Sequence, residues 1–376
     1  MQMGQGWVLG SYCALSVVCA ACSSNSSDAS TGGSGSGGDA NGGNGGSLAL
    51  AGAGGSSSAG TSSANRGGSS GSASAGAGGS AAPCVGACTV DLAAGLASPT
   101  ALAVDANYVY VLLGSNATVQ RIPLAGGNPE TIASVELGVP GLDGLAVDAT
   151  SVYFTVESGG AHTGVMKAPL AGGPVENLAP DTAKPQMLRI NASMAFFVGD
   201  SIVSGVPLAG GPVVTLVSEG DKGSPQRIAL DQSYAYFTDD SPFNYTIKRS
   251  LLGGDGTLTL GMNEPEMSDV AVDSARGVFY LSSGDLKKIG VGSPDVLAPG
   301  LTGTGDYMLL DGDTIYATND TQGSIVKVAK TGGTPTTVAT GQSMFMQSLT
   351  ADATTLYWID RGDALGTSGV VRKTAK

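Results

Sequence analysis

Short apolar runs recur through most of the chain in a fixed order. Each run ends at an Asp or Asn, passes through a short polar turn, and leads into a second apolar run that holds an aromatic residue. The seven positions that end the first run are Asp105, Asp148, Asn191, Asp231, Asp273, Asp311 and Asp352. They lie about 41 residues apart on average. A period of about 40–45 residues built from short strands is typical of a β-propeller blade.

Two further strands complete each unit. A third strand has the pattern of Val or Ile followed two residues later by Lys or Arg, as in Val119–Arg121 and Ile325–Lys327. Paired glycines such as Gly126-Gly127 follow in several units and supply the positive φ angles that a tight turn requires. We interpret the repeated turn acids as Asx-type residues that bind local backbone, with a ring of calcium ligands as the alternative.

The two ends of the repeat predict a closed ring. The last unit has three strands, whereas Thr89–Ala93 has the pattern of a lone fourth strand before the first unit. Pairing these segments would remove an open sheet edge. The sequence therefore predicts an all-β fold, a seven-bladed β-propeller over residues 84–376 that an N-terminal strand closes. Six blades would require leaving out the Asn191 unit.

The second strands carry a recognisable motif. They read Val-Tyr-Phe-Thr at 152–155 and Leu-Tyr-Trp-Ile-Asp at 356–360. These segments resemble the YWTD-type propellers of lipoprotein-receptor ectodomains and related bacterial secreted proteins. The resemblance covers the whole repeat region through this short motif, although typical members have six blades. It implies a domain that binds proteins or peptides.

The N-terminal region has the pattern of an export signal followed by a tether. Residues 7–21 are apolar but shorter than the ~20 residues of a membrane-spanning helix. The segment Cys19–Ser23 resembles a bacterial lipoprotein signal, which implies a signal peptide over 1–22, lipidation of Cys22 and sorting to the outer membrane or cell surface. Ordinary secretion after cleavage is the alternative. Residues 23–82 are almost wholly small and polar, so we predict a disordered low-complexity linker.

The cysteines beyond the export signal number two. Cys84 and Cys88 would meet an oxidising compartment in an exported protein, so we expect a disulfide between them. Two thiolates without a second pair cannot complete a tetrahedral zinc site. The sequence therefore predicts a disulfide at this position and no metal site.

Charge and composition narrow the function. The chain has 31 Asp and Glu against 18 Lys and Arg, for a net charge of -13, which argues against a nucleic-acid partner. The propeller carries nearly all of this charge, and acidic surfaces attract cations or basic partners. His162 is the only histidine, which leaves little material for nucleophilic or metal-assisted catalysis. We predict no cofactor, with calcium as the one ion that this acidity leaves open.

Function is best sought where the blades differ, because a residue repeated in every blade serves the blade itself. The position five before the turn Asp is polar in every unit, yet its identity varies. We predict a ring of ligand-binding groups at the mouth of the central channel: Thr100, Asp143, Gln186, Gln226, Ser268, Asp306 and Gln347. On the same face, Asp239, Asp240, Phe243 and Tyr245 in one long loop form a second candidate binding edge.

These features favour a surface-tethered, monomeric binding module with no catalytic residues. Its partner would be a protein, peptide or glycan, and its contact with a membrane would be through a lipid anchor only. The alternative is a propeller hydrolase or lyase that uses the channel-mouth carboxylates Asp143 and Asp306, since two suitably spaced acids suffice for glycoside hydrolysis.

Overall fold

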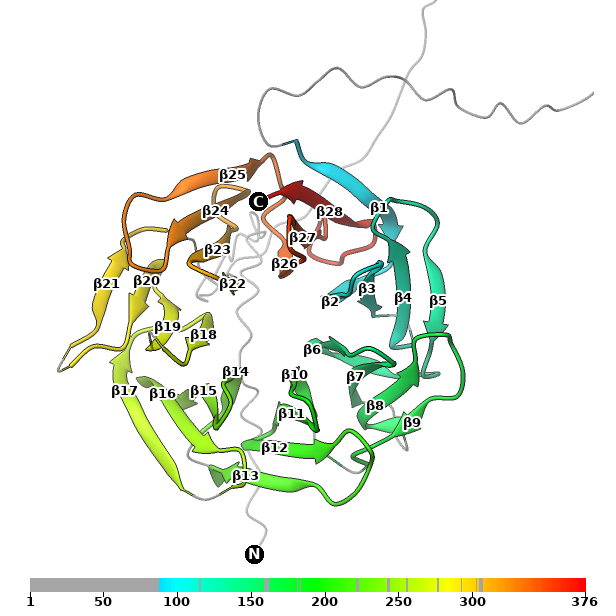
Figure 1. Ribbon diagram of the computed structural model, residues 1–376, viewed down its shortest axis with the longest axis horizontal. Coiled ribbons are helices and arrows are strands. Elements are labelled where there is room, and N and C mark those ends of the chain that lie inside the picture. The colour runs from blue at the N-terminus through cyan, green and yellow to red at the C-terminus, as the bar shows by residue number, and fades with distance from the viewer. Residues whose placement is uncertain are drawn as a thin grey trace, which may run out of the picture. The chain divides into compact units, whose positions relative to one another are not determined.

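The protein is described by a computed structural model covering residues 88–376 apart from 115, 159–161, 181, 183, 221, 222, 242, 243, 255, 276, 292, 302 and 304–306. Within these residues, 28 strands form seven four-stranded antiparallel sheets arranged as a ring (Figure 1). The predicted all-β, seven-bladed propeller is confirmed. The Asn191 unit forms a complete blade, so the six-bladed alternative is wrong.

In blades 1 to 6 the strands follow chain order from the channel outward, and in blade 7 β1 takes the outermost place (Figure 1). Blade 1 holds β2 (Pro99–Val104), β3 (Tyr108–Leu113), β4 (Thr118–Pro123) and β5 (Glu130–Ala133). Blade 2 holds β6 (Val139–Val147), β7 (Ser151–Ser158), β8 (Gly164–Pro169) and β9 (Glu176–Asn177). Blade 3 holds β10 (Gln186–Ile190), β11 (Met194–Gly199), β12 (Ile202–Pro207) and β13 (Val214–Ser218).

The second half of the ring follows the same plan. Blade 4 holds β14 (Pro225–Leu230), β15 (Tyr234–Ser241), β16 (Asn244–Leu251) and β17 (Thr257–Glu264). Blade 5 holds β18 (Asp269–Asp273), β19 (Gly277–Ser282), β20 (Asp285–Lys288) and β21 (Asp295–Ala298). Blade 6 holds β22 (Met308–Asp311), β23 (Thr314–Asn319), β24 (Ser324–Ala329) and β25 (Thr336–Thr340). Blade 7 holds β26 (Met346–Ala351), β27 (Thr355–Asp360), β28 (Gly369–Ala375) and β1 (Val90–Leu96).

The N-terminal strand closes the ring as the sequence predicts. Strand β1 pairs antiparallel with β28, with Val90 opposite Lys373 and Asp91 opposite Arg372. The strand is longer than the expected segment Thr89–Ala93, because pairing continues through two bulges to Leu96. The outer edge of β28 is thereby covered, which removes one site of edge-to-edge association.

The core lies between neighbouring blades, where apolar side chains from adjacent sheets pack together. Tyr110 of blade 1 packs in one cluster with Phe154 of blade 2, and Trp358 of blade 7 packs with Tyr316 of blade 6. Polar links join the same neighbours. Three third-strand cations each donate to a backbone carbonyl of the next blade, in the bonds Arg121 to Leu170, Lys167 to Leu208 and Lys373 to Leu124.

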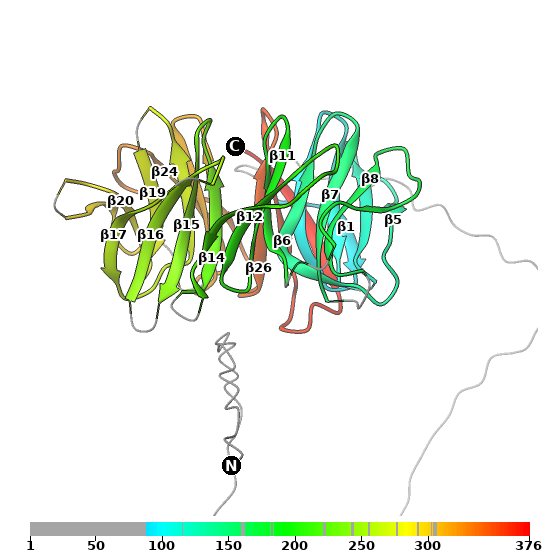
Figure 2. The ribbon, with the colours of Figure 1, turned by 90° about the horizontal axis from the view of Figure 1, so that it is seen from below.

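The common direction of the blades gives the propeller two different faces (Figure 2). We name the face where the inner strands begin the loop face. It also carries the loops between second and third strands, such as the β27–β28 loop at the bottom of Figure 2. We name the opposite face, which carries the Asp turns and the Gly-Gly turns, the turn face.

The N-terminal predictions lie outside the described residues. These are the signal peptide over 1–22, lipidation of Cys22, the linker over 23–82 and the Cys84 end of the expected disulfide with Cys88. In the part of the chain that the structure covers, no helix is both long and apolar enough to span a membrane.

Candidate functional site

The inner strands lie around the centre of the ring (Figure 1). Their residues line a cavity of about 480 Å³. Each inner strand is an edge strand of its sheet. Its unpaired backbone edge therefore faces the channel. Most lining side chains are aliphatic, but six polar side chains also line the cavity: Asp143, Arg189, Asp269, Tyr307, Ser348 and, near the end of β26, Thr350. Four of them sit near the starts of their inner strands, and Arg189 reaches back to meet them. The polar part of the channel is therefore nearer the loop face.

An ion pair joins two blades at this polar end. One guanidinium nitrogen of Arg189 in β10 lies 2.7 Å from a carboxylate oxygen of Asp143 in β6. Burial opposes the charged form, but the Asp143 carboxylate outweighs it and raises the pKa of Arg189. The hydroxyl of Ser348 in β26 donates to the other Asp143 oxygen at 3.4 Å and accepts the Leu102 N–H at 3.0 Å. Asp143 is thus contacted by side chains from two other blades, Arg189 of blade 3 and Ser348 of blade 7.

A second group of polar side chains, Arg227, Asp269 and Tyr307, comes from blades 4, 5 and 6. Both oxygens of Asp269 accept backbone N–H groups at 2.8 Å, one from Val270 and one from Met308. Burial raises the pKa of Asp269 despite the nearby Arg227. The guanidinium of Arg227 stacks on the ring of Tyr307, with its central carbon 4.8 Å from the ring centroid. A cation on an aromatic face in such a site is well stabilised.

Local backbone irregularities place these side chains in the channel. Strand β6 is bulged between Pro140 and Leu145, and Asp143 within the bulge adopts a φ of 47°. A bulge re-aims the side chains beyond it. In blades 4 and 6, second-strand threonines support the same region, because the Thr238 hydroxyl accepts the Arg227 N–H and the Thr318 hydroxyl accepts the Tyr307 N–H.

The predicted ring is only partly assembled. Of its seven members, Asp143 lines the cavity, Asp306 lies outside the described residues, and the other five do not line it. The Thr100 hydroxyl donates to the Leu112 carbonyl, and the Gln226 amide donates to Ser224. Gln186, Ser268 and Gln347 are half-buried at the starts of their strands.

The physical reason for this difference is strand alternation. Successive side chains of a strand point to opposite faces of the sheet, so a shift of one residue exchanges them. In blades 5 to 7 the polar group at the channel sits four residues before the turn acid, at Asp269, Tyr307 and Ser348. The bulge in β6 moves Asp143 into the same set from the fifth position. Of the described members of the predicted ring, only Asp143 therefore lines the cavity, and ligand binding at these positions stays a prediction.

The second candidate edge serves mostly to hold blade 4 together. Asp239 is fully buried and lies 2.6 Å from the ammonium of Lys248, which also contacts Glu219 at 2.8 Å. Burial, followed by the Asp239 charge, raises the pKa of Asp240, and burial likewise raises the pKa of Tyr245. Phe243 lies outside the described residues. Asp239 is thus a structural ion-pair partner, while Asp240 and Tyr245 remain half-buried at the loop face.

Five polar residues of the cavity wall were not predicted from the sequence: Arg189, Asp269, Tyr307, Ser348 and Thr350. The repeat held a usable signal for them. Two residues before the turn acid, four blades have Ala and blade 3 has Arg189. Four residues before it, the residue type changes from Ala101 in the first blade to Ser348 in the last. At both positions the residue type differs between blades, which is the same signal that marks the fifth position before the turn acid.

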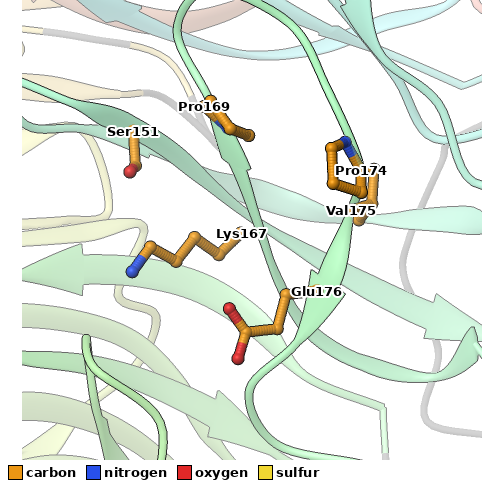
Figure 3. Close-up of a pocket in the computed structure, with 6 residues that line it drawn as sticks. All are labelled: Ser151, Lys167, Pro169, Pro174, Val175 and Glu176. Carbon is orange, nitrogen blue, oxygen red and sulfur yellow. The ribbon is translucent and has the colours of Figure 1, made fainter.

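A smaller hollow of about 220 Å³ lies on blade 2 (Figure 3). Its lining consists of Ser151, Lys167, Pro169, Pro174, Val175 and Glu176. Lys167 is already engaged there, because its ammonium donates to the Leu208 carbonyl at 2.8 Å and lies over the Tyr153 ring. Since Arg121 and Lys373 make the same link in other blades, we regard this hollow as part of the blade-to-blade joint. Within the described residues, no group of three or more metal-ligating side chains comes together.

No family model matches the chain, and no curated protein matches it. Among solved structures, the propeller is similar to virginiamycin B lyase from Staphylococcus aureus. The catalytically inactive form with quinupristin aligns at 12% identity and a TM-score of 0.59, over 77% of this chain and 98% of that chain.

YCF48 from Cyanidioschyzon merolae aligns at 12% identity and a TM-score of 0.55, over 76% of this chain and 98% of that chain. The computationally designed Ika8 protein aligns at 13% identity with the same TM-score, over 75% and 98%. A nidogen/laminin complex gives 17% identity and a TM-score of 0.46 over 59% of this chain and 89% of that chain, which is too low to argue from. At these identities the similarity shows the propeller fold alone.

Proposed function

We propose that this protein is a non-catalytic binding module that holds a protein, peptide or glycan at the loop face, over the polar end of the channel. The observation that carries the proposal is the Asp143–Arg189 pair in the wall of a cavity of about 480 Å³. Ligand sites commonly have volumes of about 300–1,000 Å³ with a few well-placed polar groups. The side chain of Arg189 keeps 37% of its surface accessible, although the inner strands surround it.

The engagement of the channel carboxylates supports binding over catalysis. Asp143 is paired with Arg189, and both oxygens of Asp269 accept backbone N–H groups. A general acid or base needs a free oxygen within hydrogen-bond reach of a substrate. Either carboxylate would have to share or give up contacts between neighbouring blades in order to exchange a proton with a substrate.

The remaining parts of the proposal concern family and location. The Tyr-Phe and Tyr-Trp second strands support a YWTD-type propeller, and the segment Cys19–Ser23 supports a bacterial lipoprotein signal. Lipidation of Cys22 would then anchor the propeller at the outer membrane or cell surface through residues 23–82. A disulfide between Cys84 and Cys88 would stiffen the start of the propeller.

The test is a binding screen of the purified full-length chain on peptide and glycan arrays. Paired replacement of Asp143 and Arg189 by Ser and Ala, as the double variant Asp143→Ser/Arg189→Ala, removes the ion pair without leaving one charge unpaired. We expect ligands of the native chain to lose at least tenfold in affinity with this variant. Asp313→Asn, which changes an exposed acid on the turn face, is the matched control.

Unchanged binding by the double variant would place the ligand elsewhere and contradict the proposal. Turnover of glycosides or lactones by the native chain, abolished by Asp143→Asn, would support a hydrolase or lyase instead.

A further inference from the structure

Large apolar side chains are exposed on neighbouring loops of the loop face. Among the described residues, five of the eleven exposed large apolar side chains lie in or next to three loops of this face. They are Leu137 and Val139 between blades 1 and 2, Met344 and Phe345 before blade 7, and Leu365 in the β27–β28 loop. We name these five residues the apolar rim. Single exposed apolar side chains are ordinary, whereas a group of them marks an interaction site.

Hydrogen bonds join the blade 7 part of the rim to blade 1. The Phe345 carbonyl accepts the N–H of Arg361, at the start of the β27–β28 loop, at 3.1 Å. Near the other end of that loop, which lies at the bottom of Figure 2, the Gly366 carbonyl accepts the Ser98 N–H at 2.8 Å. Ser98 directly precedes β2, so the loop that carries Leu365 lies against the start of blade 1.

Further bonds continue across blade 1 to the start of blade 2. The Ser98 carbonyl accepts the N–H of Gly114, which follows β3, at 2.8 Å. In the next loop, the side-chain oxygen of Asn116 accepts the Leu137 N–H at 3.2 Å. The rim residues therefore belong to one connected set of loops on three successive blades.

The two most exposed leucines of the rim are held in place. Leu365 is 74% exposed, yet its N–H donates to the Asp363 carboxylate at 2.9 Å and its carbonyl accepts the Ser98 hydroxyl at 3.0 Å. Leu137 is 79% exposed and adopts a φ of 58°, a conformation that side chains other than glycine rarely adopt. Strained backbone concentrates at functional sites. A side chain on a fixed backbone also loses less freedom when a partner binds.

Charge on the loop face indicates which partner fits the rim. Within the described loops of this face, six acids stand against two cations, Lys184 and Arg361. The acids are Glu136, Asp200, Glu219, Glu266, Asp320 and Asp363. Two copies of the chain that met through this face would bring like charges together, which opposes association. A basic partner would meet a complementary field.

The chain enters the propeller from the opposite face. Strand β28 runs from the loop face to the turn face, and β1 pairs with it antiparallel, with Val90 opposite Lys373. The start of β1 therefore lies at the turn face. A tether that precedes Cys88 would attach there and would leave the apolar rim on the other side, where a separate molecule can reach it.

We propose that the apolar rim docks a basic protein partner, with Phe345, Leu365 and Leu137 as the apolar anchors. This inference rests on the proposed binding function and narrows its ligand to a protein. The anchors would insert into an apolar surface of the partner, while lysine and arginine side chains around that surface would face the acids of the loop face. The main apolar contacts would thus lie on blades 7 and 1, beside the channel.

The chemistry of the rim favours a protein over a glycan. Leucine, valine, methionine and phenylalanine side chains offer no strong hydrogen-bond donor or acceptor to sugar hydroxyls. Met and aromatic side chains are enriched at protein interfaces. Among the described residues, Met344 and Phe345 are the only methionine and phenylalanine that are exposed, and they are adjacent in the rim.

The experiment measures binding of short labelled peptides to the full-length chain by fluorescence anisotropy. The probe is a peptide of alternating lysine and leucine, and the paired probe has serine in place of each leucine. We expect the leucine peptide to bind tighter by roughly tenfold or more, because burying one leucine side chain is worth more than a tenfold step. Phe345→Ser/Leu365→Ser should remove this preference and leave the binding of the serine peptide unchanged.

A matched control comes from the turn face. Val291, between β20 and β21, is fully exposed. Val291→Ser removes an apolar side chain from the other face and should leave the binding of both peptides unchanged. Thermal unfolding of each variant shows that it is folded, as expected for changes at exposed side chains. Replacing the lysines of the probe by glutamate should abolish binding.

Several outcomes would overturn the inference. Equal affinity for the leucine and serine peptides, or no effect of Phe345→Ser/Leu365→Ser, would remove the apolar anchors. Dimers of the native chain in sedimentation velocity that this variant abolishes would assign the rim to a second copy. Glycan-array ligands that the variant loses would assign it to a glycan.

The channel variant separates this inference from the proposed function. Array ligands lost with Asp143→Ser/Arg189→Ala but retained with Phe345→Ser/Leu365→Ser would overturn the rim as the docking site. The proposed binding over the polar end of the channel would then stand. The reverse pattern would contradict the proposed position over the channel and support the rim.

Discussion

The two faces of the propeller follow opposite rules. On the turn face, Asp105, Asp148, Asp231 and Asp352 each accept two backbone N–H groups with one oxygen and a second-strand tyrosine hydroxyl with the other. On the loop face, the residues near the channel change from blade to blade. The repeated cluster of acid, backbone N–H groups and tyrosine holds the turn in place, which confirms the Asx-type interpretation. On the loop face, the variation in residue type between blades is what we expect of a ligand-binding surface.

The exceptions on the turn face obey the same logic. Blade 3 has Asn191, which binds the turn backbone, and its partner position holds Phe196 in place of tyrosine. In blade 5 Phe279 takes the tyrosine position and Lys330 of the following blade pairs with Asp273. Blade 6 keeps a tyrosine, Tyr316, and Lys376 of the following blade pairs with Asp311. Where the tyrosine is missing, the second carboxylate oxygen of the turn acid is therefore either replaced, as in Asn191, or paired with a lysine, as in Asp273.

The largest expected effect comes from breaking this turn cluster. Asp148→Ala removes the acceptor of two backbone N–H groups and of the buried Tyr153 hydroxyl, so we expect a loss of about 3 kcal/mol in the free energy of unfolding. Asp148→Asn combined with Tyr153→Phe recreates the pair of blade 3 and should cost about 1 kcal/mol. Chemical denaturation of the three proteins measures the difference.

The reciprocal change in blade 3 is the control for that experiment. Asn191→Asp with Phe196→Tyr should install the cluster and leave stability equal or higher. Equal losses for Asp148→Ala and for the double variant in blade 2 would mean that the tyrosine bond adds nothing.

A smaller effect is expected at the bulge that places Asp143. A Cβ atom at Gly144 would overlap the hydroxyl oxygen of Thr155, which is fully buried, so Gly144→Ala should cost about 2 kcal/mol. Gly253→Ala is the control, because a Cβ there meets nothing within 4 Å. Adding Thr155→Ala should restore part of the loss, since that hydroxyl has no hydrogen-bond partner among the described residues. A folded Gly144→Ala protein with native stability would contradict the tight bulge.

The smallest expected effect is on how stability depends on pH, which should differ between the native turn cluster of blade 2 and the Asp148→Asn/Tyr153→Phe variant. Burial raises the pKa of Asp148, but bonds from the Thr150 and Ser151 N–H groups and from Tyr153 lower it more. Its stabilisation is thus present above about pH 4 and is lost as the pH falls further. Burial, then the bond to Asp148, raises the pKa of Tyr153 to about 12. This contribution is present below about pH 10 and is lost as the pH rises toward 12.

Denaturation midpoints from pH 2 to 12, compared for the native chain and for Asp148→Asn/Tyr153→Phe, measure this contribution. The native chain should lose more stability at both extremes. Parallel curves for the two proteins would show that the cluster does not titrate with folding.

The repeat made much of the fold predictable from local sequence. The number of blades, the strand order, the turn acids and the closing strand follow from two features of the sequence. These are the spacing of the repeat and the alternation of apolar and polar residues within each short strand. The channel site was predictable only in part. Asp143 was found, but Arg189 was not, because the prediction assumed one register for all inner strands and bulges changed it.

The chain's own order of residues determined that seven similar sheets would form and where each would turn, since those features depend on neighbours in sequence. Only the closed ring decided that Asp143 would meet Arg189, 46 residues away, and Ser348, 205 residues away. Their contact depends on where each inner strand bulges and on how the blades are spaced around the axis. Such geometry emerges from packing between sheets, and no short segment encodes it.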